Sequence, residues 1–162
     1  MLIIIAGLPG TGKTTIAKAL AALTGATHLN SDVIRSQLGL MGQYTAEAKQ
    51  HVYDGLLERA GAALAAGKTV IVDSTFYQKS IREPFEKLAN DCGVAVIWVE
   101  IQASERTLED RLRKPRPDSE ADFAVYEKIR DQFEPLPEER LILNSEMETP
   151  ESAAKRIQQY VT

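Results

Sequence analysis

Apolar runs alternate with helical patterns along the chain, which predicts an alternation of strands and helices. Leu2–Ala6 is apolar at every position, as is typical of a buried strand. A helix is expected through Thr14–Leu23, closed by Gly25, and a short strand at Thr27–Asn30. Later strands are expected at Thr69–Val72, which ends at Asp73, and at Val94–Ile101 and Leu141–Leu143. The remaining helices are expected from about Asp32 to Leu38, capped by Ser31, and at Ala46–Ala66, Lys79–Asn90, Ser104–Lys114 and Pro150–Tyr160.

Two segments with proline interrupt this pattern. Pro84 fits the first turn of the helix at Lys79–Asn90 only if that helix begins later than the pattern indicates. Pro115 and Pro117 cannot continue a helix, so the basic stretch 111–118 is expected to be an exposed, mobile loop.

The order of elements predicts βα units and a mostly parallel sheet, that is, an α/β fold. The chain has 162 residues, which is enough for one domain with a full hydrophobic core. No repeat or linker divides it, so residues 1–162 are expected to form a single domain.

Composition and charge narrow the classes of function. The formal net charge of −4 argues against a protein that grips long nucleic acid, although a local basic patch stays open. No apolar run is long enough to cross a bilayer, and Leu2–Ile5 is too short for the core of a signal peptide. The single cysteine, Cys92, excludes an internal disulfide. We therefore expect a cytoplasmic protein with no membrane partner.

The segment that follows the first strand has the pattern of a phosphate-binding loop. Gly7-x-x-x-x-Gly12-Lys13-Thr14 matches the Walker A motif, with a strand before it and a helix after it. Glycines let backbone N–H groups turn around an anion, Lys13 can reach the β- and γ-phosphates, and the Thr14 hydroxyl can bind Mg²⁺. The alternative, a flexible strand-to-helix turn, does not need the whole motif. ATP is the expected ligand, held by Gly7, Leu8, Pro9, Gly10, Thr11, Gly12, Lys13, Thr14 and Thr15.

Asp32 and Arg35 follow the second expected strand and lie three residues apart on one helix face. In a P-loop phosphotransferase a carboxylate here can accept the proton of an acceptor hydroxyl, and an arginine can orient the acceptor. Alternatively, Asp32 only stabilises a helix N-terminus and Arg35 is solvated.

Asp73 ends the strand Val70–Val72 and resembles the carboxylate of a Walker B strand. Ligands bind at this end of the strands in open parallel sheets, so Asp73 is a candidate Mg²⁺ residue beside Thr14. Ser74 and Thr75 are candidates to line the same site. A simple turn after the strand is the alternative.

Arg111, Arg113 and Arg116 provide candidate lid arginines, because phosphoryl transfer spreads negative charge over the moving group. Arg111 and Arg113 lie nearest the helix that would anchor the loop and are favoured as catalytic residues. A solvated basic surface is the alternative for each.

Four stretches carry a resemblance to a known family: GLPGTGKTT, NSDVIR, VIVDSTF and DRLRKPRPDSEAD. In this order they resemble the small P-loop kinases grouped with the 5′-kinase domain of bacteriophage polynucleotide kinase. That group is related to zeta-toxin, gluconate and chloramphenicol kinases. The resemblance implies a three-layer α/β/α sandwich, with about five parallel strands in the order 2-3-1-4-5 and a helical lid at about 111–122.

The resemblance also implies roles for individual residues. Lys13 and Thr14 would bind phosphate and Mg²⁺, Asp32 would be the general base, and Arg35 would face the acceptor. Arg111 or a neighbour would be the lid arginine and would contact the nucleotide. The chain departs from adenylate kinases at Asp73-Ser74-Thr75-Phe76, which lacks their arginine, and its lid spacing differs from that of the phage enzyme. The acceptor therefore does not follow from the resemblance.

The leading hypothesis is a kinase that moves the γ-phosphate of ATP to a hydroxyl. The resemblance favours a polynucleotide 5′-hydroxyl as acceptor, whereas the acidic balance favours a small molecule such as a sugar, a nucleotide sugar or an antibiotic. A regulatory module that hydrolyses ATP slowly is the rival hypothesis.

Further expectations concern single residues. Tyr44, His51 and Tyr53 are candidates to line the acceptor cleft, and residues 144–146 are candidates to contact adenine. His28 is interpreted as structural.

Overall fold

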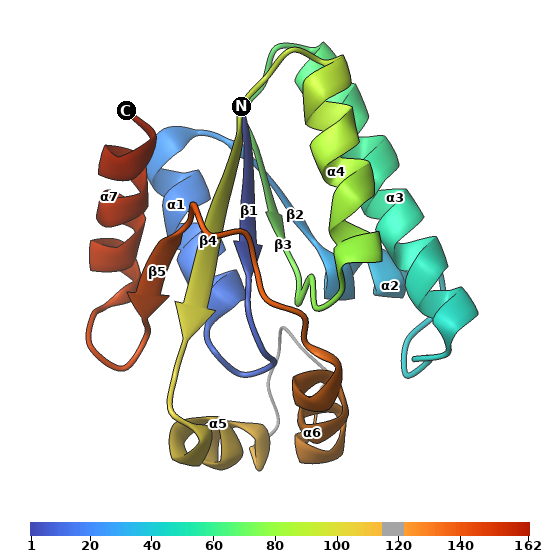
Figure 1. Cartoon of the computed structure of the whole chain (residues 1–162), viewed down its shortest axis with the longest axis vertical. Helices are drawn as coiled ribbons and strands as arrows, with labels where there is room; N and C mark the ends of the chain where they lie inside the picture. Colours follow the sequence, from blue (N-terminus) through green and yellow to red (C-terminus); the bar gives the residue numbers. More distant parts are fainter. Residues whose placement is uncertain (115–121) are drawn as a thin grey trace.

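Five parallel strands form one sheet at the centre of the molecule (Figure 1), and the computed structural model describes residues 1–114 and 122–162. The strand order is β2-β3-β1-β4-β5, which confirms the expected order 2-3-1-4-5. The strands are β1 (Leu2–Ala6), β2 (Thr27–Asn30), β3 (Val70–Asp73), β4 (Val96–Gln102) and β5 (Leu141–Asn144). β1 is the central strand, so the segment that follows it emerges at the middle of the sheet edge.

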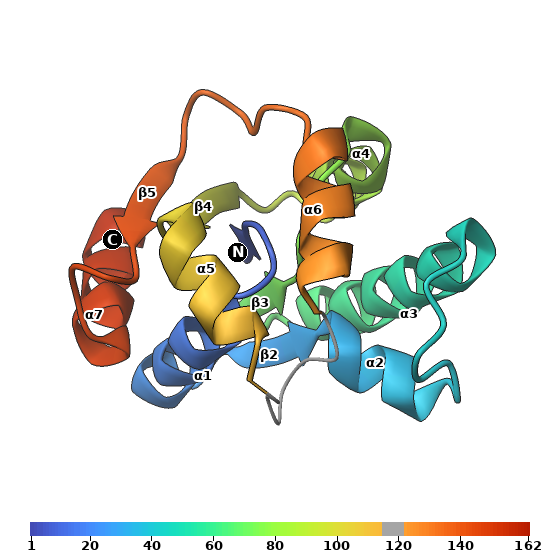
Figure 2. The same cartoon turned by 90° about the horizontal axis from the view of Figure 1, so that it is seen from below.

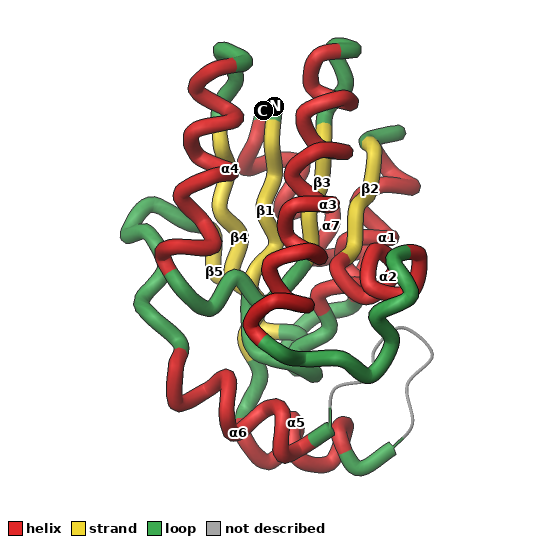
Figure 3. The backbone as a smooth tube through the Cα atoms, turned by 90° about the vertical axis from the view of Figure 1, so that its right-hand side faces the viewer, coloured by secondary structure: helices red, strands yellow, loops and turns green. Residues whose placement is uncertain are grey.

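Helices cover both faces of the sheet, as expected for a three-layer α/β/α sandwich. α3 and α4 lie over one face, with α1 and α7 behind the sheet in Figure 3. The side chains of β1 alternate between these layers: Leu2 and Ile4 pack toward α3 and α4, whereas Ile3 and Ile5 pack toward α1 and α7. The covering helices are α1 (Lys13–Thr24), α3 (Ala46–Ala65), α4 (Lys79–Asp91) and α7 (Pro150–Val161).

Three further helices lie near the carboxyl ends of the strands. α2 (Ser31–Gln37) directly follows β2. α5 (Glu105–Leu112) and α6 (Phe123–Gln132) lie beyond the strand ends, below the sheet in Figure 1, and Figure 2 shows them side by side. Leu108 and Leu112 of α5 form a small hydrophobic cluster with Tyr126 of α6, and Leu8 of the phosphate loop packs against it. The α5–α6 pair therefore rests directly on the phosphate loop.

The expected mobile loop at 111–118 is only partly described. α5 continues through Leu112, so Arg111 is helical rather than part of a loop. Residues 115–121, including Arg116, lie outside the described residues. α6 was not expected from the sequence, although Asp122 caps it by accepting a hydrogen bond from the Val125 N–H.

One local expectation was wrong and another is confirmed. The cap of α2 is Asn30 rather than Ser31, because the Asn30 side chain accepts from the Val33 N–H at 3.0 Å. α4 begins at Lys79, which confirms the expected start of this helix, and Pro84 therefore lies inside the helix and not in its first turn. The burial of Phe85 and Ala89 against the sheet holds α4 together despite the amide hydrogen that proline lacks. Within the described ranges, no helix is long and apolar enough to span a membrane.

Candidate active site

The phosphate loop joins the central strand β1 to the first turn of α1. Gly7, Gly10 and Gly12 all have positive φ angles, of 150°, 83° and 97°, which residues with a side chain rarely adopt. A Cβ atom at Gly7 would lie 2.5 Å from the Ile101 carbonyl oxygen of the neighbouring strand β4. The glycines are therefore needed for the turn that aims the backbone amides at an anion.

Replacing Gly7 with alanine is expected to destabilise the protein and to abolish nucleotide binding. The new methyl group would collide with rigid backbone at Ile101, and the φ of 150° adds strain. Thermal unfolding and ADP titration measure both effects. Gly61→Ala is the matched control, because Gly61 lies within α3 and, among the described residues, its added Cβ would meet only the flexible Leu88 side chain of α4, at 3.4 Å. Equal melting temperatures and equal ADP affinities for the two variants would contradict this account.

One cavity of about 600 Å³ lies along the carboxyl ends of the strands. The phosphate loop forms one end of it. Gly7, Leu8 and Thr11 do not line the cavity but hold the loop from behind: the Thr11 hydroxyl donates to the Leu8 carbonyl at 2.9 Å. The buried Lys13 ammonium donates to the same carbonyl at 2.9 Å. The loop residues that line the cavity are Pro9, Gly10, Gly12, Lys13, Thr14 and Thr15.

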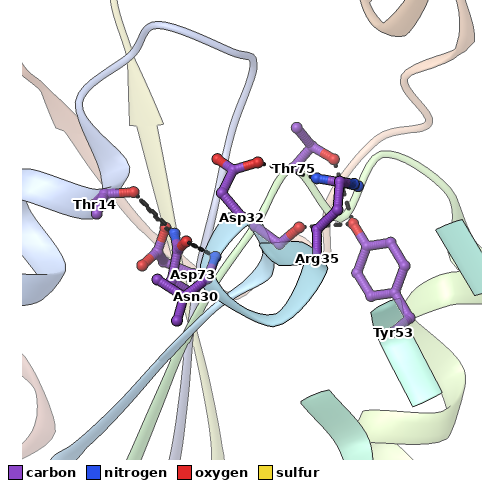
Figure 4. Close-up of polar contacts among 9 residues, drawn as sticks. Thr14, Asn30, Asp32, Arg35, Tyr53, Asp73 and Thr75 are labelled. Atoms are coloured by element: carbon purple, nitrogen blue, oxygen red, sulfur yellow. Dashed lines mark hydrogen bonds and ion pairs between the residues drawn. The ribbon is translucent and has the colours of Figure 1, made fainter. Parts of the chain in front are cut away.

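Thr14 and Asp73 meet beside the phosphate loop (Figure 4). The Thr14 hydroxyl donates to Asp73 Oδ1 at 2.8 Å, and Asn30 Nδ2 donates to the same oxygen at 2.9 Å. The register explains this meeting, because Asp73 is the partner of Asn30 in β2 and of Ile5 in β1. His28 Nε2 contacts the other oxygen, Asp73 Oδ2, so His28 has a partner that its isolation in the sequence did not predict.

The pair Thr14 and Asp73 fits a magnesium ion in its donor chemistry. A hydroxyl and a carboxylate oxygen are hard ligands, and Mg²⁺ at nucleotide sites keeps few protein ligands beside phosphates and waters. Within residues 1–114 and 122–162, no group of three or more His, Cys, Asp or Glu side chains could hold a metal. Thr14 and Asp73 would therefore need nucleotide phosphates and waters as the remaining ligands of the ion.

Asp32 and Arg35 lie on α2 and line the same cavity. Arg35 Nη1 donates to Asp32 Oδ1 at 3.0 Å, and the Asp32 side chain is 26% exposed, whereas the Arg35 side chain is 8% exposed. The Asp32 carboxylate is thus positioned by an arginine and still accessible from the cavity. Figure 4 shows both side chains rising from the start of α2, beside Thr75 and Tyr53.

The structure brings Arg111 to the cavity but not Arg113. Arg111 Nη1 donates to the Gly10 carbonyl and to the Ser145 hydroxyl, each at 3.0 Å. Arg113 is exposed, pairs with Glu109 on the outer face of the helix, and does not line the cavity. Two positions along a helix turn a side chain to a different face, which explains the difference.

The segment after β5 lies against this end of the site. Ser145 lines the cavity. Glu146 holds the start of α5 instead, because its carboxylate accepts from the Ser104 N–H at 2.8 Å and from the hydroxyls of Ser104 and Thr107. The Thr107 hydrogen bond, followed by those from Ser104, lowers the pKa of Glu146. Glu146 therefore stabilises the N-terminus of α5. Contact between Ser145 and adenine stays a prediction.

The other end of the cavity contains residues that the sequence indicated only in part. Tyr44 and Tyr53 line it as expected, whereas His51 is exposed on α3 and does not. The Tyr53 hydroxyl bonds to Ser74 Oγ at 2.8 Å, and burial raises the pKa of Tyr53. Lys49 and Tyr77 also line this end and were missed. A signal for Lys49 exists, because it lies one helical turn before Tyr53 on α3.

Comparisons with solved structures agree with this architecture. A sugar kinase of Janibacter superposes with a TM-score of 0.77 and 20% identity, and the match covers 99% of this chain and 93% of that one. The APS kinase of Mycobacterium tuberculosis, solved with AMPPNP and APS, gives a TM-score of 0.74 and 17% identity, and the match covers 99% and 96%. The TM-scores show that this chain shares the fold of these P-loop kinases.

Sequence comparison finds relatives of this chain in mycobacteria. An uncharacterized protein of Mycobacterium tuberculosis is 30% identical over 123 residues, which is 68% of this chain and 25% of the relative. The chain therefore spans about a quarter of the length of that relative. Residues 2–136 match the family model AAA_33, described as an AAA domain, and this range contains the phosphate loop, Asp32, Asp73 and Arg111. With most of its length matched, the chain belongs to the AAA_33 family.

Proposed function

We propose that this protein is an ATP-dependent phosphotransferase that moves the γ-phosphate of ATP to a hydroxyl group of a small molecule. The observation that carries the proposal is that the phosphate loop and Asp32, which is paired with Arg35, line the same cavity. A nucleotide-binding loop alone needs no second, carboxylate-bearing end. A phosphotransferase needs both, because the acceptor hydroxyl must meet the γ-phosphate while a base removes its proton.

Each end of the cavity has its own task in this proposal. The loop amides and Lys13 hold the β- and γ-phosphates, and Arg111 swings from the Gly10 carbonyl to the transferring group. Thr14 and Asp73 hold Mg²⁺, which supplies charge neutralisation on the phosphates when bound. Lys13 and Arg111 thereby place positive charge where negative charge develops.

Asp32 performs the proton transfer at the acceptor end. Its carboxylate accepts the proton of the acceptor hydroxyl while that oxygen bonds to the γ-phosphorus. The bond between the γ-phosphorus and the β–γ bridging oxygen breaks, and ADP leaves with that electron pair. Arg35 holds the carboxylate in place through the 3.0 Å contact to Oδ1.

A small acceptor has more support than a polynucleotide 5′-hydroxyl. The solved neighbours include a sugar kinase and an APS kinase, which gives no specific support to a polynucleotide acceptor. The net charge of −4 also disfavours a long anionic partner. We therefore propose a sugar-sized acceptor.

The test is a transfer assay with γ-labelled ATP, Mg²⁺ and a panel of sugars, sugar acids, nucleosides and a hydroxyl-ended oligonucleotide. At least one small acceptor is expected to become labelled, and to raise the rate of ADP formation in step with its labelling. Label that appears only in the oligonucleotide would overturn the small acceptor. Label that appears only as inorganic phosphate, at a rate that no acceptor changes, would support a slow regulatory ATPase instead.

A further inference from the structure

Two cations from different helices line the acceptor end of the cavity. Arg35 lies on α2 and is buried, and Lys49 lies on α3 and is half-buried. Burial, and in second place the positive charge of Arg35, lowers the pKa of Lys49. Two like charges that are partly removed from water destabilise a folded protein unless an anion compensates them.

The described residues compensate only one of these charges. Arg35 pairs with Asp32 at 3.0 Å. Lys49 Nζ instead donates to the neutral Tyr77 hydroxyl at 3.3 Å and lies 5.1 Å from the centre of the Tyr77 ring. In the part of the chain that the structure describes, no carboxylate forms an ion pair with Lys49. The three charged groups Asp32, Arg35 and Lys49 therefore leave one positive charge at this end of the cavity.

The Arg35 guanidinium also has hydrogen-bonding capacity to spare. Nη1 is used by Asp32, and the guanidinium carbon lies 4.6 Å from the centre of the Tyr44 ring. Nε is buried and has no hydrogen-bond partner among the described residues. A buried donor without a partner costs free energy, and a guanidinium edge matches the two oxygens of a carboxylate or phosphate.

We infer that the acceptor is a small hydroxylated anion, whose carboxylate or phosphate group is bound by Arg35 and Lys49 while its hydroxyl faces Asp32. The inference rests on the proposed function, because it assigns the chemical class of that acceptor. The anion supplies the missing negative charge beside Lys49 and an acceptor for Arg35 Nε. Tyr77 holds the Lys49 ammonium in position.

The walls of this end favour a small molecule. Val125 and Ile129 of α6 line the cavity from below the sheet, and Tyr53 and Tyr77 line it from the α3 side. The whole cavity of about 600 Å³ serves both the nucleotide and the acceptor, and it falls within the range of small-molecule sites.

Matched pairs of molecules that differ in one anionic group test the inference. Glycerate is compared with glycerol, gluconate with glucitol, and a nucleoside 3′-phosphate with its nucleoside. Calorimetry measures their binding to the protein with ADP and Mg²⁺, and γ-labelled ATP measures transfer.

The test variant is Lys49→Gln, and Lys68→Gln, at an exposed position, is its control. Lys49→Gln is expected to weaken binding of the preferred anion, and to raise its KM, by roughly ten- to a hundredfold. The KM for ATP stays unchanged.

The outcomes separate this inference from the proposed function. If an anion binds and Lys49→Gln lowers the affinity for it, but no label is transferred to any acceptor, then the anion site stands and the kinase function fails. If the neutral molecule of a pair binds as tightly as the anion and is labelled at the same rate, the kinase function stands and the anion site is overturned. The site is also overturned if no anion in the panel binds at millimolar concentration, or if Lys68→Gln acts like Lys49→Gln.

Discussion

Replacing Arg111 with methionine is expected to lower the rate of phosphoryl transfer by about 10³–10⁵-fold, the range known for arginines that stabilise a transferring phosphoryl group. Arg111 reaches the phosphate loop at the Gly10 carbonyl, where the γ-phosphate of ATP is expected. Its charge therefore acts mainly on the transition state, and ADP affinity should change little. Single-turnover transfer with the acceptor found in the panel measures the effect.

Arg113→Met is the matched control for this prediction. Arg113 makes the same kind of contact as any exposed helix residue, an ion pair with Glu109 four positions before it. Such surface pairs contribute little, so transfer should stay close to that of the unmodified protein. If Arg113→Met slowed transfer as much as Arg111→Met, the choice of lid arginine would be wrong.

Asp32→Asn is expected to lower the rate of transfer by roughly 10²–10⁴-fold, the usual contribution of a general base. Asparagine keeps the shape of the side chain and an oxygen that can accept from Arg35, but it cannot take the acceptor proton. ATP binding should be nearly intact, because Asp32 lies on α2 and is not part of the phosphate loop. Transfer rates and ADP titrations measure the two effects.

Asp54→Asn controls for the loss of one carboxylate. Asp54 is exposed on α3 and, among the described residues, accepts a hydrogen bond only from Gln50 of the same helix, at 2.8 Å. It should leave both rate and affinity unchanged. Transfer at the unmodified rate by the Asp32→Asn protein would remove Asp32 from the mechanism.

Much of the donor end could be predicted because it is local in the sequence. The phosphate loop is one continuous motif whose glycines have a conformational reason, and the structure shows that reason at Gly7 and Gly12. Asp73 could be paired with Thr14 because the ends of parallel strands meet at one sheet edge. The burial of β1 on both faces could likewise be predicted, because successive side chains of a strand point to opposite faces and every residue of Leu2–Ala6 is apolar.

The acceptor end could be predicted less well because tertiary packing assembles it. Lys49 becomes notable only through its closeness to Arg35, which lies on another helix. His28 gains its partner across the β2–β3 pairing, which a lone histidine does not indicate. Arg111 and Arg113 could not be separated without knowing where the helix ends and which face rests on the phosphate loop.

The most direct measurement of the central claim is a crystal structure of the protein with ADP, Mg²⁺ and an aluminium fluoride that mimics the transferring phosphoryl group. We expect the Arg111 guanidinium to contact the fluoride atoms and the Asp32 carboxylate to face the side of the mimic opposite ADP, with room for a hydroxyl between the carboxylate and the mimic. If protein atoms separated the mimic from Asp32 and Arg111 still contacted the Gly10 carbonyl, the structure would contradict phosphoryl transfer to an acceptor. Nucleotide binding would then be the only function that the site supports.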